Sequence, residues 1–214
     1  MKFISNADVQ MATQILEWVQ VFLVDANPMM KRSPQSDGEP ICPFAKACLS
    51  ANTIYFSFHH EVNGKSTEQI EDILLDCRDP FKREPPYDPK QRLTKALLVV
   101  FPEIPSSEGE VLDLVHDNIK TQFVRDGLMV TQCYPRSDGR SVHNPALRVY
   151  TSPYSLMAVR HMALHDVLFV EEDEAWFAAY DQRFGIRFRE PEQLQDYEKP
   201  LLNIYRRAKE RFVR

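Results

Sequence analysis

Two adjacent histidines, His59 and His60, stand in the segment TIYFSFHHEV (53–62), which alternates apolar and polar side chains as a β-strand does. The alternation places Tyr55, Ser57, His59 and Glu61 on one face and Ile54, Phe56, Phe58, His60 and Val62 on the other. We therefore predict a buried His60 and a solvated His59. A buried imidazole can ligate a metal or haem iron, and a core histidine hydrogen-bonded to a carbonyl is the alternative.

A second pair, His161 and His165, lies in SPYSLMAVRHMALHD (152–166). We predict a helix there, because Ser152 suits the N-cap and Pro153 the first turn. One helical turn between two histidines can chelate zinc, but the glutamate that follows the first histidine in zinc proteases is missing, and a third ligand must come from elsewhere. A solvated or hydrogen-bonded helix face is the alternative.

Arginine and cysteine side chains offer further chemistry. Arg148 and Arg160 could hold a carboxylate or a haem propionate, or could form surface ion pairs. The four cysteines are Cys42, Cys48, Cys77 and Cys133, whose irregular spacing favours reduced thiols over disulfides. Cys42 and Cys48 do not form a CxxC pair. Cys133 precedes His143 by ten residues and could pair with it as nucleophile and base if the side chains meet.

The elements that must position these residues can be read from periodicity and capping signals. We predict helices at 7–24, from Ser66, from Ser107 to about Arg125, at 152–166, 172–184 and 191–212, strands at 53–62, 96–101, 128–134 and 146–151, and loops at 27–40 and 79–89. The order predicts an α+β fold, with a mostly antiparallel or mixed sheet flanked by helices and a helical C-terminal part. We expect one domain over 1–214, with a core at about 38–170 and a helical extension at about 171–214.

Composition narrows the function. The 214 residues carry a net charge of −5, which disfavours nucleic acid as a partner. No apolar run of membrane-spanning length and no secretory leader is evident, so we expect a cytoplasmic protein without a membrane partner. Phosphate loops, GxSxG and EF-hand loops are absent from the sequence. A small-molecule substrate is expected, and a homo-oligomer is compatible with the sequence.

One ordered set of motifs resembles a known family. It comprises PICPFA (40–45), the strand that ends at His59 and His60, LLVVFPE (97–103), the segment around Leu114 to His116, GLMV (127–130), and the loop that leads to HNP (143–145) and Arg148. This order resembles the YqcI/YcgG family over roughly residues 38–170. The segment SPYSLMAVRHMALHD departs from the better-known members and is similar to a related bacterial branch.

The resemblance implies a haem-dependent oxygenase that acts on a nitrogen of a small amine or guanidine, as in natural-product biosynthesis. It implies His60 as the iron ligand, with His59 and then His161 as the next choices, and Arg148, Arg160 and Cys42 near the haem. Asp166 and His143 would act on the substrate, and Asp166 could pair with a cationic group. Two alternatives remain open: a small-ligand-binding or accessory protein without chemistry, and a cofactor-free enzyme that uses Cys133 or Cys42.

Overall fold

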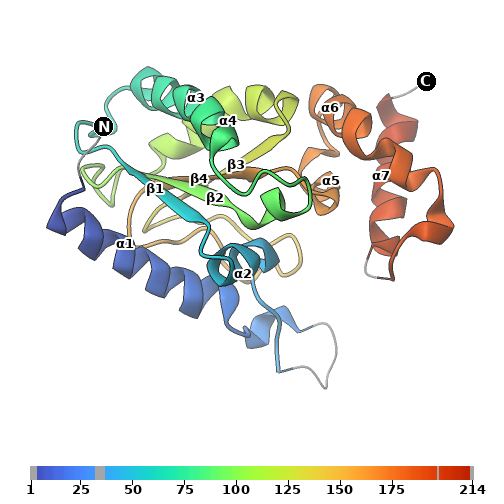
Figure 1. The fold of residues 1–214 in the computed structure, drawn as a ribbon, viewed down its shortest axis with the longest axis horizontal. Coiled ribbons are helices and arrows are strands. Elements are labelled where there is room, and N and C mark those ends of the chain that lie inside the picture. The colour runs from blue at the N-terminus through green and yellow to red at the C-terminus, as the bar shows by residue number, and fades with distance from the viewer. Residues whose placement is uncertain (1–3, 32–36, 197, 213–214) are drawn as a thin grey trace. The chain divides into compact units, whose positions relative to one another are not determined.

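The structure is a computed structural model that describes residues 4–31, 37–196 and 198–212 (Figure 1). Residues 32–36 of the loop predicted at 27–40 lie outside this description. A four-stranded sheet has the order β1-β2-β4-β3, formed by β1 (Ile54–Phe58), β2 (Ala96–Val100), β3 (Leu128–Cys133) and β4 (Leu156–His161). Strand β2 runs parallel to β1 and antiparallel to β4, so the sheet is mixed and the predicted α+β class is confirmed.

Seven α-helices precede, separate and follow the strands along the part of the chain that the structure describes. They are α1 (Asn6–Trp18), which continues into a π-helical segment (Val19–Val24), α2 (Pro43–Ser50), α3 (Thr67–Arg83), α4 (Val111–Arg125), α5 (Val167–Val170), α6 (Glu174–Phe184) and α7 (Lys199–Phe212). Short 3-10 turns occur at Pro28–Met30, Gln91–Thr94, Leu164–Asp166, Gly185–Phe188 and Pro191–Gln193. The chain divides into two compact units, Met1–Asn118 with Val130–Arg160, and Ile119–Met129 with His161–Arg214. Whether they act as the one predicted domain stays a prediction.

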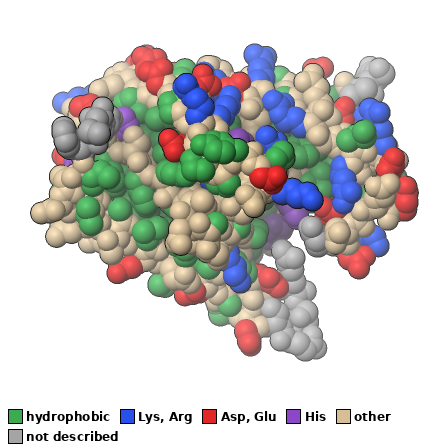
Figure 2. All heavy atoms as spheres, viewed as in Figure 1, with side chains coloured by type: hydrophobic (Ala, Val, Ile, Leu, Met, Phe, Trp, Pro, Cys, Tyr) green, Lys and Arg blue, Asp and Glu red, His purple; other side chains and the backbone are tan. Residues whose placement is uncertain are grey.

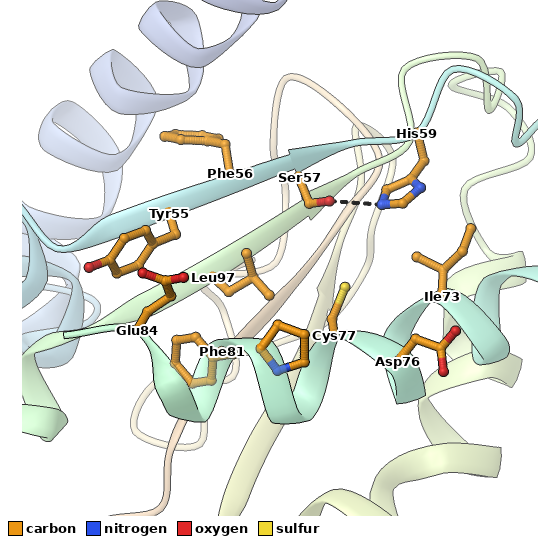
Figure 3. Close-up of a pocket in the computed structure, with 11 residues that line it drawn as sticks. Tyr55, Phe56, Ser57, His59, Ile73, Asp76, Cys77, Phe81, Glu84 and Leu97 are labelled. Atoms are coloured by element: carbon orange, nitrogen blue, oxygen red, sulfur yellow. Dashed lines mark hydrogen bonds between the residues drawn. The ribbon is translucent and has the colours of Figure 1, made fainter. Parts of the chain in front are cut away.

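In the first unit, β1 and β2 send alternate side chains to opposite faces of the sheet. One face packs against α1 and is closed by a hydrophobic cluster that includes Ile15, Val19, Leu98, Val100, Cys133 and Leu156. The other face, which carries Tyr55, Ser57 and Leu97, is turned toward α3 (Figure 3). Strand β2 pairs on both sides, which agrees with the unbroken apolar run that predicted a central strand.

Local capping fixes where α1 and α3 begin. Ser5 caps α1, because its hydroxyl accepts from the backbone N–H of Asp8 while the Asp8 carboxylate accepts from the N–H of Ser5. Ser66 caps α3 by accepting from the N–H of Gln69, as its spacing predicted. Helix α3 then continues through Pro80 to Arg83, so the loop predicted from residue 79 begins too early.

The second unit is helical around an aromatic core. Phe177 and Tyr180 of α6 are fully buried, and Tyr205 of α7 stacks on Phe188 with ring centroids 4.3 Å apart. The helices predicted at 172–184 and 191–212 are confirmed in kind, although the second begins at Lys199 after a 3-10 turn. Gly127 ends α4 with a positive φ of 73°, the conformation that favours glycine.

Two predicted elements are wrong, and a third begins later than predicted. Residues 152–166 form strand β4 and a short turn instead of a helix, and 146–151 form no strand beyond one isolated bridge, between Arg140 and Arg148. The helix predicted from Ser107 begins only at Val111. Leu156 and Met157 of β4 point to opposite faces of the sheet and both are fully buried, and a strand buried on both faces lacks the alternation that distinguishes it from a helix.

Candidate functional site

A pocket of about 450 Å³ lies in the first unit, between the sheet and α3 (Figure 3). Helix α3 contributes residues that follow the helical spacing of one stripe: Ile73, Asp76, Cys77, Pro80 and Phe81. The strands contribute Tyr55, Phe56, Ser57 and Leu97, and His59 and Glu84 complete the lining. The walls are mainly apolar with a few polar groups, which is the usual composition of a small-molecule site.

Ser57 and His59 lie at one end of this pocket and, with Glu61 outside its lining, form a hydrogen-bonded chain. The Ser57 hydroxyl lies 2.9 Å from Nε2 of His59, and Nδ1 of His59 lies 3.0 Å from a carboxylate oxygen of Glu61. His59 is 5% exposed, and its ring packs against that of Phe101 with centroids 5.9 Å apart. We call Ser57, His59 and Glu61 the Ser-His-Glu relay.

The partners of His59 determine which nitrogen carries the proton in its neutral form. A carboxylate only accepts hydrogen bonds, so Nδ1 must donate to Glu61. Nε2 then has a lone pair and accepts from the Ser57 hydroxyl. A hydroxyl aimed at an imidazole that a carboxylate orients is the arrangement that activates a serine nucleophile.

The alternation of the sequence explains this convergence. Ser57 is in β1, and the backbone N–H of His59 still donates to the carbonyl of Val100, so the extended geometry persists past the last residue of the strand. Side chains two residues apart therefore remain on one face. The predicted grouping of Tyr55, Ser57 and His59 on one face is confirmed, because their side chains lie on the side of the strand that faces α3 (Figure 3).

The end of the pocket away from His59 is formed by Tyr55, Phe81 and Glu84 (Figure 3). Burial and the nearby Glu84 carboxylate raise the pKa of Tyr55, whose hydroxyl donates to the carbonyl of Pro85 at 2.8 Å. Lys95, 1% exposed, donates to the carbonyls of Phe81, Lys82 and Glu84 and so caps the C-terminal end of α3. Burial lowers the pKa of this lysine.

The structure reverses the predicted burial of the two histidines. His59 is buried, whereas the side chain of His60 is 46% exposed, with Nε2 2.7 Å from Asp8 and Nδ1 3.5 Å from Glu103. The hydrogen bond that His60 donates to the Asp8 carboxylate is the main cause that raises the pKa of His60. The burial prediction is wrong because α3 covers the polar face of β1, which the alternation alone assigns to solvent.

Several sequence-predicted residues meet on the opposite face of the sheet. Cys42 caps α2, where its sulfur accepts from the N–H of Ala45 at 3.4 Å, and the Arg160 guanidinium lies 4.0 Å from the centre of the Phe44 ring. Burial raises the pKa of Cys48 and of Cys133 to about 12 in each case. Buried thiols of this kind stay protonated near neutral pH, which disfavours Cys133 as a nucleophile.

The remaining predicted residues lie elsewhere. His143 and Arg148 are exposed in the loop before β4, and Arg148 pairs with Asp138 at 2.7 Å, which confirms the surface ion pair considered for it. In the second unit, Asp166 is fully buried and accepts from the N–H of Ala163 at 2.7 Å. His161 ends β4 and His165 lies in a 3-10 turn, so the helical spacing proposed for zinc does not exist.

Among the described residues, no group of three or more His, Cys, Asp and Glu side chains is arranged to hold a metal ion. Both ring nitrogens of His59 are engaged, and those of His60 face two carboxylates. An axial haem ligand requires a ring nitrogen that is open toward the iron. Within the part of the chain that the structure describes, no helix has the length and apolarity to cross a bilayer. Acidic and basic side chains are interspersed on the face that Figure 2 shows.

Sequence reasoning missed Ser57 and Glu61 as chemical partners of His59. The signal was present as the i, i+2, i+4 spacing of Ser57, His59 and Glu61 on one strand face. Cys77 and Glu84 could not be assigned to the pocket, because that requires knowledge of how α3 docks on the sheet.

The first unit is thus an α+β sheet unit with a pocket that is lined by Ser57 and His59 of the Ser-His-Glu relay. A family model described as "Domain of unknown function (DUF6875)" matches residues 12–195, so the chain belongs to this family. Comparison with curated proteins and with solved structures gives no match.

Proposed function

We propose that this protein catalyses acyl transfer from a small ester or thioester to Ser57, followed by hydrolysis. The observation that carries the proposal is the relay itself: serine, imidazole and carboxylate are hydrogen-bonded in sequence at 2.9 and 3.0 Å, and the serine and the imidazole line a cavity. A nucleophile and a base within hydrogen-bond reach, with a third group that orients the base, is the geometry on which nucleophilic catalysis depends.

In this reaction Ser57 acts as the nucleophile, and His59 acts first as the base and then as the acid. The Ser57 oxygen attacks the acyl carbon while its proton passes to Nε2 of His59. The imidazolium then returns this proton to the leaving alcohol or thiol as the bond from the acyl carbon breaks. Water, deprotonated by the same nitrogen, attacks the acyl-serine and releases the acid, and Ser57 recovers its proton from His59.

The two hydrogen bonds of the relay differ in how far solvent screens them. His59 is almost completely shielded, so its contact with Ser57 lies in a region of low dielectric. The side chain of Glu61 is 58% exposed, so solvent screens its charge and its main contribution is orientation of the ring. Loss of Glu61 should therefore slow the reaction less than loss of His59 or Ser57.

Labelling with a fluorophosphonate probe, followed by peptide mass spectrometry, tests the proposal directly. We expect one adduct, on Ser57, and hydrolysis of p-nitrophenyl acetate that Ser57→Ala and His59→Gln both reduce by about 10²-fold or more. Ser107, exposed in the loop before α4, provides the control Ser107→Ala. Absence of a Ser57 adduct, together with unchanged hydrolysis in Ser57→Ala, would overturn the proposal and leave the pocket as a binding site without chemistry.

Haem-dependent oxygenation of an amine or guanidine nitrogen, which the resemblance implies, stays a prediction with a separate test. The visible absorption spectrum of protein expressed with a haem precursor decides it. A stoichiometric Soret band that His60→Ala abolishes would support haem ligation. A colourless protein that haemin cannot reconstitute would rule it out, and would leave the Ser57 proposal unaffected.

A further inference from the structure

The end of the pocket away from His59 combines aromatic rings with a carboxylate. Tyr55 and Phe81 present ring surfaces, and the Glu84 carboxylate lies beside the Tyr55 ring (Figure 3). A ring face and a carboxylate attract the same kind of group, a protonated or quaternary ammonium, the first through its quadrupole and the second through its charge.

The charged side chains that line the pocket are both acidic. Glu84 lies at this end, and Asp76 lies beside Ile73 toward the end with His59 (Figure 3). The lining residues include Asp76 and Glu84 and contain no lysine or arginine among those that the structure describes. The ammonium of Lys95 lies 5.0 Å from the centre of the Phe81 ring and is directed at three backbone carbonyls. Lys95 is itself 1% exposed and is not part of the lining, so it offers no direct contact to an anionic ligand.

The spacing along β1 sets the length of a ligand that reaches both ends. Tyr55 and Ser57 are two residues apart on one face of the strand, which corresponds to about 7 Å. A carbonyl carbon at the Ser57 oxygen and an ammonium at the Tyr55 ring must therefore be separated by only a few bonds. Choline-type esters, with about four bonds between these atoms, have that length.

We propose that the pocket selects acyl esters or thioesters whose leaving group ends in an ammonium, with the cation held by Tyr55 and Glu84. This inference rests on the acyl-transfer function proposed for Ser57. It assigns Glu84 and Tyr55 to substrate selection, whereas the relay performs the chemistry.

A pair of substrates of equal shape isolates the charge. Acetylthiocholine and 3,3-dimethylbutyl thioacetate differ only in the exchange of the quaternary nitrogen for carbon, and both release a thiol that a chromogenic disulfide detects. We expect kcat/KM to be about tenfold higher for the cationic thioester, the combined size of a cation–π contact and a partly exposed ion pair. Tetramethylammonium should inhibit competitively.

Matched variants locate the origin of this preference. Glu84→Gln should lower it to about threefold or less, whereas Asp72→Asn, which removes a carboxylate of α3 outside the pocket lining, should leave it unchanged. Equal rates for both thioesters, with Ser57 still labelled by the fluorophosphonate, would overturn the inference and leave the acyl-transfer proposal standing. Loss of preference in Asp72→Asn as well as in Glu84→Gln would also overturn it. Absence of both labelling and turnover would remove both proposals.

Discussion

The two faces of the sheet in the first unit are built from the same strands, yet only one of them has the properties of a site. The face toward α1 is filled by aliphatic and aromatic side chains, and it buries the thiol of Cys133 deeply enough to raise its pKa to about 12. The face toward α3 leaves a pocket of about 450 Å³, with a serine and a histidine in contact on its wall. Reactive residue types occur on both faces.

The difference between the faces is one of partners and space. Cys133 has a reactive atom, but burial holds it in the neutral form. Ser57 is intrinsically less reactive, but an oriented base lies 2.9 Å away and a cavity can admit a substrate. Residue type therefore identifies a candidate, and the local environment decides whether it can react.

The largest expected effect concerns the two candidate nucleophiles, Ser57 on the face toward α3 and Cys133 on the face toward α1. Ser57→Ala should reduce esterase turnover by about 10²- to 10⁴-fold, because it removes the proposed nucleophile. Cys133→Ala should leave turnover within about threefold, because a protonated buried thiol cannot attack. Steady-state hydrolysis of p-nitrophenyl acetate measures both. The opposite ranking would move the chemistry to the thiol face.

Two neighbouring leucines of β2 allow the packing of the two faces of the sheet to be compared. Leu98 is in the closed hydrophobic cluster, and Leu97 lines the pocket, although both are less than 10% exposed. Leu98→Ala should lower the free energy of unfolding by about 2–5 kcal/mol, and Leu97→Ala by about 1–2 kcal/mol, because fewer packed contacts are lost beside an existing cavity. Urea denaturation of the two variants gives the ranking. Equal losses would mean that the α3 face is packed as tightly as the other.

The third prediction concerns the stability of the C-terminal end of α3, which forms part of the pocket wall. Lys95→Met should destabilise the fold by about 1–3 kcal/mol, because three helix-end carbonyls lose their buried donor. Amide hydrogen exchange should increase near residues 81–84. The exposed Lys90 supplies the control Lys90→Met, for which a change within about 0.5 kcal/mol is expected. A stable Lys95→Met variant with unchanged exchange would show that α3 does not need this cap.

The sequence predicts individual elements near one another in the chain better than it predicts the site. Capping at Ser66, the apolar run of β2 and the alternation of β1 all predict local structure correctly, because each depends on neighbours in the chain. Strand β4 is missed because its register and burial depend on β2, about sixty positions earlier in sequence. The burial of His59 is missed for a similar reason, since α3 docks over a face that looks polar.

The smallest expected effect is the pH dependence of the stability that the contact between His60 and Asp8 provides. The contact with Asp8 raises the pKa of His60 above its ordinary value of 6.5, so the stability that this contact provides is present below pH 6.5 and is lost as the pH rises through the raised pKa. The pKa of Asp8 is lowered below 3.8, mainly by the backbone N–H of Ser5 and then by His60, so its contribution is present above pH 3.8 and is lost as the pH falls further.

His60→Gln should therefore cost most between about pH 5 and 6 and almost nothing near pH 9. The cost should not exceed about 1 kcal/mol, because the His60 side chain is 46% exposed and solvent screens the pair. Urea denaturation of the wild-type protein and the variant at pH 5.5, 7 and 9 measures the difference. A cost that stays constant across this range would mean that His60 supports α1 by packing alone. In that case proton-dependent chemistry on this strand would be confined to His59, on the pocket face.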